Sequence, residues 1–138
     1  MNTKRRLSLW LTLTLLWTAV LFAHSLMPAS VSHSESMGVF RLVQRLLPFL
    51  THHLLRKLGH FSGFAVLGAL WMRTVTVKTR RRPLLPLFCG LLTALSDETI
   101  QRFVPGRSGE VRDVWIDFGG VLLGALLVFL LTRKEEPT

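Results

Sequence analysis

The sequence is poor in cysteine and in acidic residues. Cys89 is the one cysteine among 138 residues, which excludes an intrachain disulfide, and its place in an apolar run favours a small buried side chain. Aspartate and glutamate number 8 against 17 lysines and arginines, which gives a net charge of +9. The positive charges flank apolar runs instead of covering one helix face, and no DNA- or RNA-binding motif is present. We therefore expect no nucleic-acid partner.

Internal repeats and low-complexity tracts are also absent, and what remains is strongly apolar. Hydrophobic residues make up 49% of the chain and its mean hydropathy is +0.41. A chain of this length and composition is typical of a single small integral membrane domain, here spanning residues 1–138.

Four segments are candidates for crossing a hydrocarbon core, which needs about 20 helical residues. They are residues 7–23, 58–72, 84–104 and 114–131. The sequence therefore predicts an all-α bundle of four transmembrane helices. The second segment is short and needs Lys57 and Arg73 to reach outward to the interface. The third ends in polar residues that protein or water must shield, namely Asp97, Glu98, Gln101 and Arg102.

The lysines and arginines predict that both termini are cytoplasmic. On that side ten of them stand against two glutamates, whereas on the other side seven stand against six carboxylates. All five histidines then fall on the outer side. A competing interpretation takes Lys4-Arg5-Arg6, the first apolar run and Ala23-His24-Ser25 as a cleavable signal peptide, which would leave three spans.

A polar linker, residues 28–36, follows the first span. Apolar residues then recur near helical spacing over residues 39–56, with basic residues and His52 and His53 between them. This pattern predicts an interfacial helix on the outer face, bent near Pro48. His52 and His53 fit solvent or lipid headgroup contacts better than metal ligation.

Polar residues line up on one face of each later span. Lys57 and His60 share a stripe on the second span, and Asp97 and Gln101 share one on the third. On the fourth, Asp113 and Asp117 lie above Gly120 and Gly124. Gly120 and Gly124, together with Gly63 and Gly68 on the second span, permit the helices to approach closely. An unpaired carboxylate that faces lipid costs free energy. We therefore expect the polar ends to converge.

The segment Pro105-Gly106-Arg107-Ser108-Gly109 predicts a tight turn, because proline and glycine set its backbone and glycine accepts positive φ. Arg107 would be held rigidly beside carboxylates. It is expected either to form a salt bridge with Asp97, Glu98 or Asp113, or to offer a bidentate fork to a substrate phosphate or carboxylate.

Together these motifs resemble the VanZ-like family of small bacterial membrane proteins. The resemblance rests on Phe22-Ala-His-Ser25, on the segment from Arg56 to Gly68, on Asp97-Glu98-Thr-Ile-Gln101 with Pro105-Gly-Arg107-Ser-Gly, and on Asp113-Val-Trp-Ile-Asp117-Phe-Gly-Gly120. It runs from about Ser25 to Gly124. Two positions depart from the family pattern: Phe64 stands where tyrosine is usual, and Asp117 where asparagine is usual.

The resemblance implies a multi-pass protein of the bacterial cytoplasmic (inner) membrane with a role in the cell envelope. The founding member of the family is associated with teicoplanin resistance, which is not assumed for this chain. Expected partners are a membrane lipid or lipid-linked envelope precursor, and an envelope protein.

Two functions remain open. One is an enzyme acting at the outer leaflet on a lipid-linked saccharide or phospholipid, with His60 or Glu98 as acid or base and with Arg107 and Lys57 holding an anionic group. The other is a binding or accessory module that uses the same pocket. Candidate catalytic residues are His60, Asp97 and Glu98; candidate substrate-binding residues are Ser25, Lys57, Gln101, Arg107, Asp113 and Asp117.

The residues support three further hypotheses less strongly than these two functions. A Ser25-His60-Asp97 nucleophile lacks the usual nucleophile-elbow context. No cofactor is expected, although a divalent metal held by His60, Asp97, Glu98 and Asp113 is an alternative, for which Mg²⁺ or Mn²⁺ fits better than zinc. A salt-bridge network that only fixes helix packing is the remaining interpretation.

Overall fold

The computed structural model describes residues 2–48, 51–78 and 84–133, and within these ranges it contains helices and their connections but no strand. Five helices follow one another along the chain. They are α1 (Thr3–Ser25), α2 (Ala29–Leu46), α3 (His52–Lys78), α4 (Leu84–Gln101) and α5 (Val111–Arg133). The predicted all-α class is confirmed.

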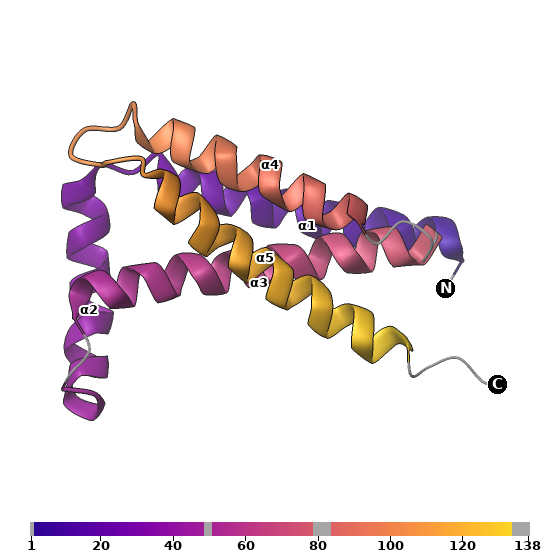
Figure 1. Ribbon diagram of the computed structural model, residues 1–138, viewed down its shortest axis with the longest axis horizontal. Helices are drawn as coiled ribbons and strands as arrows, with labels where there is room; N and C mark the ends of the chain where they lie inside the picture. Colours follow the sequence, from indigo (N-terminus) through magenta and orange to yellow (C-terminus); the bar gives the residue numbers. More distant parts are fainter. Residues whose placement is uncertain (1, 49–50, 79–83, 134–138) are drawn as a thin grey trace.

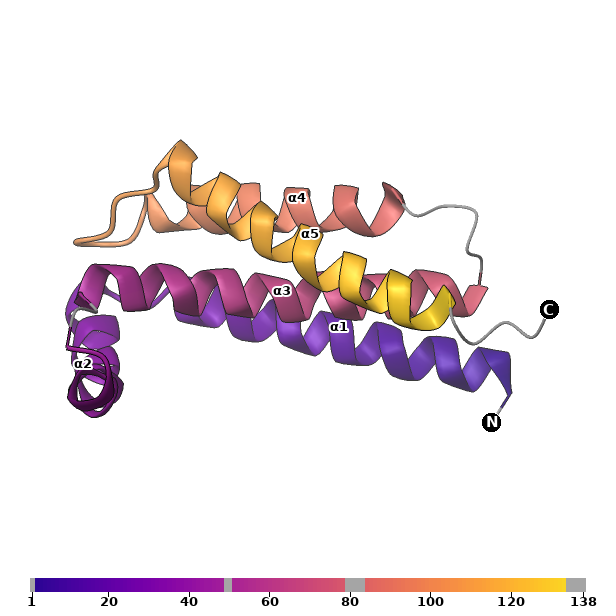
Figure 2. The same ribbon diagram turned by 60° about the horizontal axis from the view of Figure 1, so that its bottom comes forward.

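Helices α1, α3, α4 and α5 run along the long axis of the molecule, and α2 crosses one end of this bundle (Figure 1). The view turned by 60° shows the same arrangement (Figure 2). The connection between α4 and α5 lies at the α2 end, whereas the start of α1 and the end of α5 lie at the opposite end. One end of the bundle therefore collects the end of α1, the start of α3, the end of α4 and the start of α5.

Two helices are long and apolar enough to cross a bilayer. They are Thr3–Ser25 and Val111–Thr132, with hydropathies of 1.6 and 2.3, and only 6% and 33% of their apolar windows are buried inside the protein. A core helix of a soluble protein would bury such surface, whereas a membrane helix leaves it facing lipid. Helices α3 and α4, as far as they are described, do not meet the same test of length and composition.

The helix over residues 39–56 differs from the prediction. Helix α2 already begins at Ala29, inside the expected linker, and it ends at Leu46, while residues 52–56 belong to α3. Its start is fixed by the Ala29 N–H, which donates to the carbonyl of Pro105 (3.3 Å). Its end follows from Pro48: the preceding residue, Leu47, has φ −130° and ψ 78°, because proline disfavours a helical backbone before it. The proline therefore ends the helix instead of bending it.

Helices α3 and α5 pack most closely, through glycine. A Cβ at Gly124 would overlap the carbonyl group of Ala65, and one at Gly68 would overlap the backbone of Val121. Gly120 lies in the same way against the carbonyl of Phe61. The predicted close approach at these glycines is confirmed, and it fixes the register between α3, which carries His60, and α5, which carries Asp117.

Helix α1 is joined to α3 by polar contacts within an apolar surface. The hydroxyls of Thr14 and Thr74 share a buried hydrogen bond of 2.9 Å, and the Trp17 indole N–H donates to the Gly63 carbonyl, also at 2.9 Å. The small buried core between the helices includes Phe64, Leu67, Ala94 and Val121. Phe64, one of the two positions that depart from the pattern of the resemblance, thus packs as a core residue.

Candidate functional site

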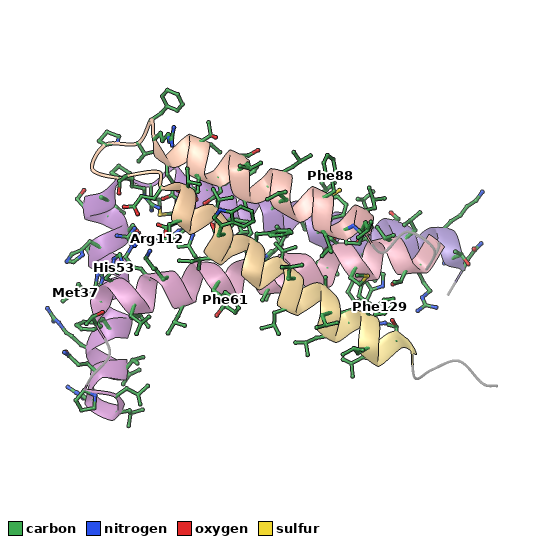
Figure 3. All side chains as sticks on the ribbon, in the orientation of Figure 1. Met37, His53, Phe61, Phe88, Arg112 and Phe129 are labelled. Carbon is green, nitrogen blue, oxygen red and sulfur yellow. The ribbon has the colours of Figure 1, made fainter. Side chains whose placement is uncertain are left out.

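The structure brings the nine predicted site residues to the same end of the bundle, the end that α2 crosses. Figure 3 labels His53 and Arg112 in this region. Four helices and the α4–α5 connection contribute to it. The residues are Ser25 from α1, Lys57 and His60 from α3, Asp97, Glu98 and Gln101 from α4, Arg107 from the connection, and Asp113 and Asp117 from α5. The predicted convergence of polar helix ends is confirmed, while the roles of the individual residues stay predictions.

Asp97 is fully enclosed and firmly held. It is 1% exposed, and its Oδ1 accepts a hydrogen bond of 2.6 Å from the Ser25 hydroxyl. Its Oδ2 accepts a second, of 2.8 Å, from the Gln101 amide. Two donors therefore orient this buried carboxylate. Because Ser25 donates to Asp97 and not to His60, the Ser25-His60-Asp97 nucleophile considered above is not formed.

Asp117 contrasts with Asp97, since its carboxylate is equally buried but not satisfied. It is 0% exposed, and neither of its oxygens has a hydrogen-bond partner among the described residues. His60 lies beside it, with Nδ1 3.7 Å from Oδ1. A ring nitrogen of His60 and one oxygen each from Asp97 and Asp117 lie within 4.8 Å of one another. These three side chains have the donor types of a metal site.

Glu98 holds the start of α5. Its Oε2 accepts a hydrogen bond of 2.9 Å from the backbone N–H of Glu110, and the Gln101 amide donates to Oε1 at 3.4 Å. A carboxylate at this place satisfies an N–H beside a helix N-terminus and interacts favourably with the helix dipole. Glu98 is thus a structural link between α4 and α5 as well as a candidate acid or base.

The turn that carries Arg107 has the predicted form. Gly106 has φ 77°, and the Arg107 N–H donates to the carbonyl of Val104 at 3.2 Å. Proline at the second position and a left-handed glycine at the third are typical of a type II turn. A side chain at Gly106 would be strained by this φ and would also press on Ala29. The turn is therefore packed against the start of α2.

Arg107 does not form the expected salt bridge with Asp97, Glu98 or Asp113 in the described part of the chain. Its Nε donates to the Met27 carbonyl (2.8 Å) and its Nη2 to the His24 carbonyl (2.9 Å). His24 lies in the last turn of α1 and Met27 follows the helix, where the negative end of the helix dipole favours a cation. Burial, and then the neighbouring charge of Arg56, lower the pKa of Arg107. Its Nη1 is buried with no acceptor among the described residues and is the donor left for a ligand.

Lys57 is also already paired. Its Nζ lies 2.6 Å from Oδ1 of Asp113, with the two side chains 20% and 30% exposed. This ion pair between α3 and α5 was not predicted. It limits Lys57 as an anion-binding group and removes Asp113 from the expected set of metal ligands.

His52 packs against side chains of α2. Its ring lies 4.4 Å from that of His33 and 5.5 Å from that of Phe40, measured between centroids. Both neighbours belong to α2, so His52 helps to hold α2 against the start of α3. This contact does not follow from its spacing in the sequence.

Two hollows meet at His60. A polar cavity of about 120 Å³ lies among α3, α4, the connection and α5, and an apolar groove of about 660 Å³ lies between α1 and α3. The polar cavity includes Arg56, Lys57, His60, Glu98, Arg107 and Asp117, and the apolar groove includes Trp17, Leu21, Ser25, Arg56, Gly59, His60 and Asp97. Arg56 and His60 line both. Sequence reasoning missed Arg56 and the groove, and a signal was available for the first, since Arg56 directly precedes Lys57.

Comparison with known proteins identifies a family but no individual relative. No curated protein and no solved structure matches the chain. The model of the VanZ/LLP1 family matches residues 10–132, which include every residue of the site. The chain therefore belongs to the VanZ/LLP1 family.

Proposed function

We propose that this VanZ/LLP1 protein is a multi-pass protein of the bacterial inner membrane. In this proposal α1, α3, α4 and α5 all cross the bilayer, both termini are cytoplasmic, and α2 lies in the outer interface. The support is that α1 and α5 are long and apolar enough to span, and that α3 and α4 run beside them (Figure 2). Part of the charge asymmetry, at residues 79–82, lies outside the described residues.

The protein binds an amphiphilic component of the cell envelope, a phospholipid or a lipid-linked saccharide, at the outer leaflet. One observation carries this proposal: the apolar groove between α1 and α3 runs up to His60 and Asp97 and adjoins the charged cavity. An acyl or prenyl chain fits the first space and an anionic headgroup the second. The volume of the groove lies in the range of small-molecule sites.

Selectivity in such a site comes from the headgroup. A lipid tail that moves from the bilayer into an apolar groove gains little binding free energy, because both surroundings are apolar. The charged headgroup gains more binding free energy in the polar cavity, since charges attract each other more strongly in partly dehydrated surroundings. Arg56 and Arg107 line this cavity, and Nη1 of Arg107 has no acceptor among the described residues. Guanidinium groups suit a phosphate or carboxylate.

Gly59 gives the sharpest test of the groove. It lines the groove, and a Cβ there meets nothing within 4 Å, so Gly59→Leu places its side chain in the groove without a clash at the helix backbone. Gly38 on α2 has the same free space but does not line the groove, which makes Gly38→Leu the matched control. Both changes favour the helix by about 1 kcal/mol.

The measurement is the lipid retained by the protein, purified in mild detergent and analysed by native mass spectrometry. We expect wild type and Gly38→Leu to retain lipid and Gly59→Leu to lose it. In the charged cavity, Arg56→Gln should weaken retention of anionic lipid while Arg112→Gln, which removes an exposed arginine outside the cavity, should not. Equal retention by Gly59→Leu and Gly38→Leu would refute the groove as the binding site.

A catalytic role is the second candidate, and the position of His60 favours it. His60 lines both hollows, so its imidazole lies where the headgroup of a bound amphiphile would meet the tail. An imidazole can transfer a proton there. Incubation with a lipid-linked saccharide or phospholipid, read by mass, separates the two: a changed substrate with wild type but not with His60→Gln supports an enzyme, and an intact, bound lipid supports a binding module. A glycopeptide susceptibility assay on a deletion strain would test the link to teicoplanin.

A further inference from the structure

We propose that His60, Asp97 and Asp117 bind a divalent cation, of which Mn²⁺ fits the donors best. This proposal does not depend on the binding of lipid. The three side chains come from α3, α4 and α5, so a bound cation would join three helices at the point where the two hollows meet.

The geometry is close to that of a coordination sphere. One ligand atom from each residue lies within 4.8 Å of the other two. Oxygen and nitrogen ligands lie about 2.0–2.2 Å from a small divalent cation, so two ligands on opposite sides of it are about 4 Å apart. A small closing movement of the side chains is enough to complete the site.

The second observation is the unsatisfied carboxylate of Asp117. It is 0% exposed, and neither oxygen has a hydrogen-bond partner among the described residues. Buried carboxylates are normally paired, hydrogen-bonded or bound to metal, because burial of an unpaired charge is costly. The distance of 3.7 Å to His60 Nδ1 is too long for a hydrogen bond and agrees with two ligands that share a cation.

Two of the nearby protein cations are engaged elsewhere in the described part of the chain. Lys57 is bound to Asp113 at 2.6 Å, and Arg107 donates to the carbonyls at the end of α1. Three arrangements can offset the buried charge of Asp97 and Asp117, namely protonation of a carboxyl group, a protonated His60 or a bound cation. A single imidazolium compensates one of the two carboxylates, whereas a divalent cation compensates both.

Asp97 is already oriented as a metal ligand would be. The Ser25 hydroxyl and the Gln101 amide each donate to one of its oxygens, at 2.6 and 2.8 Å. Such outer contacts fix ligand orientation in metal sites, and their loss typically lowers metal affinity 10- to 100-fold.

The donor set selects the class of metal. Carboxylates suit Mg²⁺ and Mn²⁺, and an imidazole adds preference for a transition metal, so one histidine with two aspartates favours Mn²⁺ over Mg²⁺. The set differs from the one expected from the sequence, because Glu98 binds the Glu110 N–H and Asp113 binds Lys57. Asp117 takes their place.

The test uses full-length protein in detergent, stripped with a chelator and titrated with MnCl₂. Bound Mn²⁺ is measured by electron paramagnetic resonance and, after desalting, by elemental mass spectrometry. We expect about one Mn²⁺ per chain for wild type, and none held through desalting for Asp117→Asn or Asp97→Asn. Glu110→Gln removes an exposed carboxylate from the same end of the protein and should bind like wild type. Ser25→Ala should bind roughly 10- to 100-fold more weakly.

Thermal unfolding with and without Mn²⁺ gives a second readout. Mn²⁺ should raise the melting temperature of wild type and Glu110→Gln and leave that of Asp117→Asn unchanged. Failure of wild type to bind Mn²⁺, or equal binding by Asp117→Asn, refutes the site. If Asp117→Asn does not fold, Ser25→Ala decides in its place. Lipid retention by wild type and its loss in Gly59→Leu are measured separately, so failure of the metal site and failure of the proposed function are distinguishable.

Discussion

Replacing Gly124 with alanine tests whether contact between the backbones of α3 and α5 holds the site together. A Cβ at Gly124 overlaps the carbonyl group of Ala65, and real Cβ atoms essentially never come closer than 3.0 Å to such atoms. The helices must therefore separate. Overpacking of this kind costs about 1–3 kcal/mol. Separation would also move Asp117 away from His60, since these residues lie one to two turns above the contact on α5 and α3.

Gly59→Ala is the matched control. The same methyl group is added to a glycine of α3 whose Cβ would meet nothing within 4 Å. Both variants gain about 1 kcal/mol of helix propensity, so the difference between them isolates the contact of α5 with α3. We expect Gly124→Ala to be less stable than Gly59→Ala by about 1–3 kcal/mol in a denaturing-detergent titration followed by circular dichroism. Equal stabilities, within about half a kcal/mol, would refute the reasoning.

Three further predictions concern single contacts and sidedness. The Thr14–Thr74 hydroxyl bond joins α1 to α3. A hydroxyl has one proton, so one of the two threonines donates across this bond and the other donates to a carbonyl of its own helix. A double-mutant cycle with valine should give a coupling of about 0.6 kcal/mol, and zero coupling would show that the bond adds nothing. With Cys89→Ala as background, an impermeant maleimide on intact cells should label Ser108→Cys and not Asn2→Cys. The opposite labelling would invert the topology. A mass of the purified protein that lacks the N-terminal segment containing residue 2 would indicate signal cleavage. Partial burial, and then the charges of His33 and Arg56, lower the pKa of His52 from its ordinary value of 6.5. Its neutral form is favoured in the folded state, so its stabilising contact is complete above pH 6.5 and weakens as the pH falls below it. Hydrogen-exchange protection of α2 should fall accordingly in wild type and be independent of pH in His52→Gln.

The helices themselves were largely predictable. Apolar runs and helical spacing are local properties of the chain, and they located four of the five helices. The boundaries were less predictable where a distant residue fixes them. Helix α2 starts in a segment expected to be a linker, because Ala29 docks on Pro105. No local pattern contains that contact.

The gathering of these polar residues at one end of the bundle was also predictable, because ionisable groups at the ends of apolar helices are costly where they face lipid alone. Their partners were not. Arg107 was expected either to pair with a carboxylate or to offer a fork to a substrate, but two of its nitrogens donate to the carbonyls of His24 and Met27. Lys57 was expected to hold a ligand, but it binds Asp113. The partner that each of these two side chains contacts depends on distances between helices, which the sequence does not give.

The sequence alone determined that this protein is helical, that its helices have polar ends, and which residues those ends carry, since these properties depend on hydrophobicity and spacing along the chain. Only the tertiary structure decided which donor meets which acceptor. Glycine contacts such as that of Gly124 with Ala65 set the rotation and register of α3 against α5. Because of that register, Asp113 meets Lys57, while Asp117 lies buried beside His60 and Asp97.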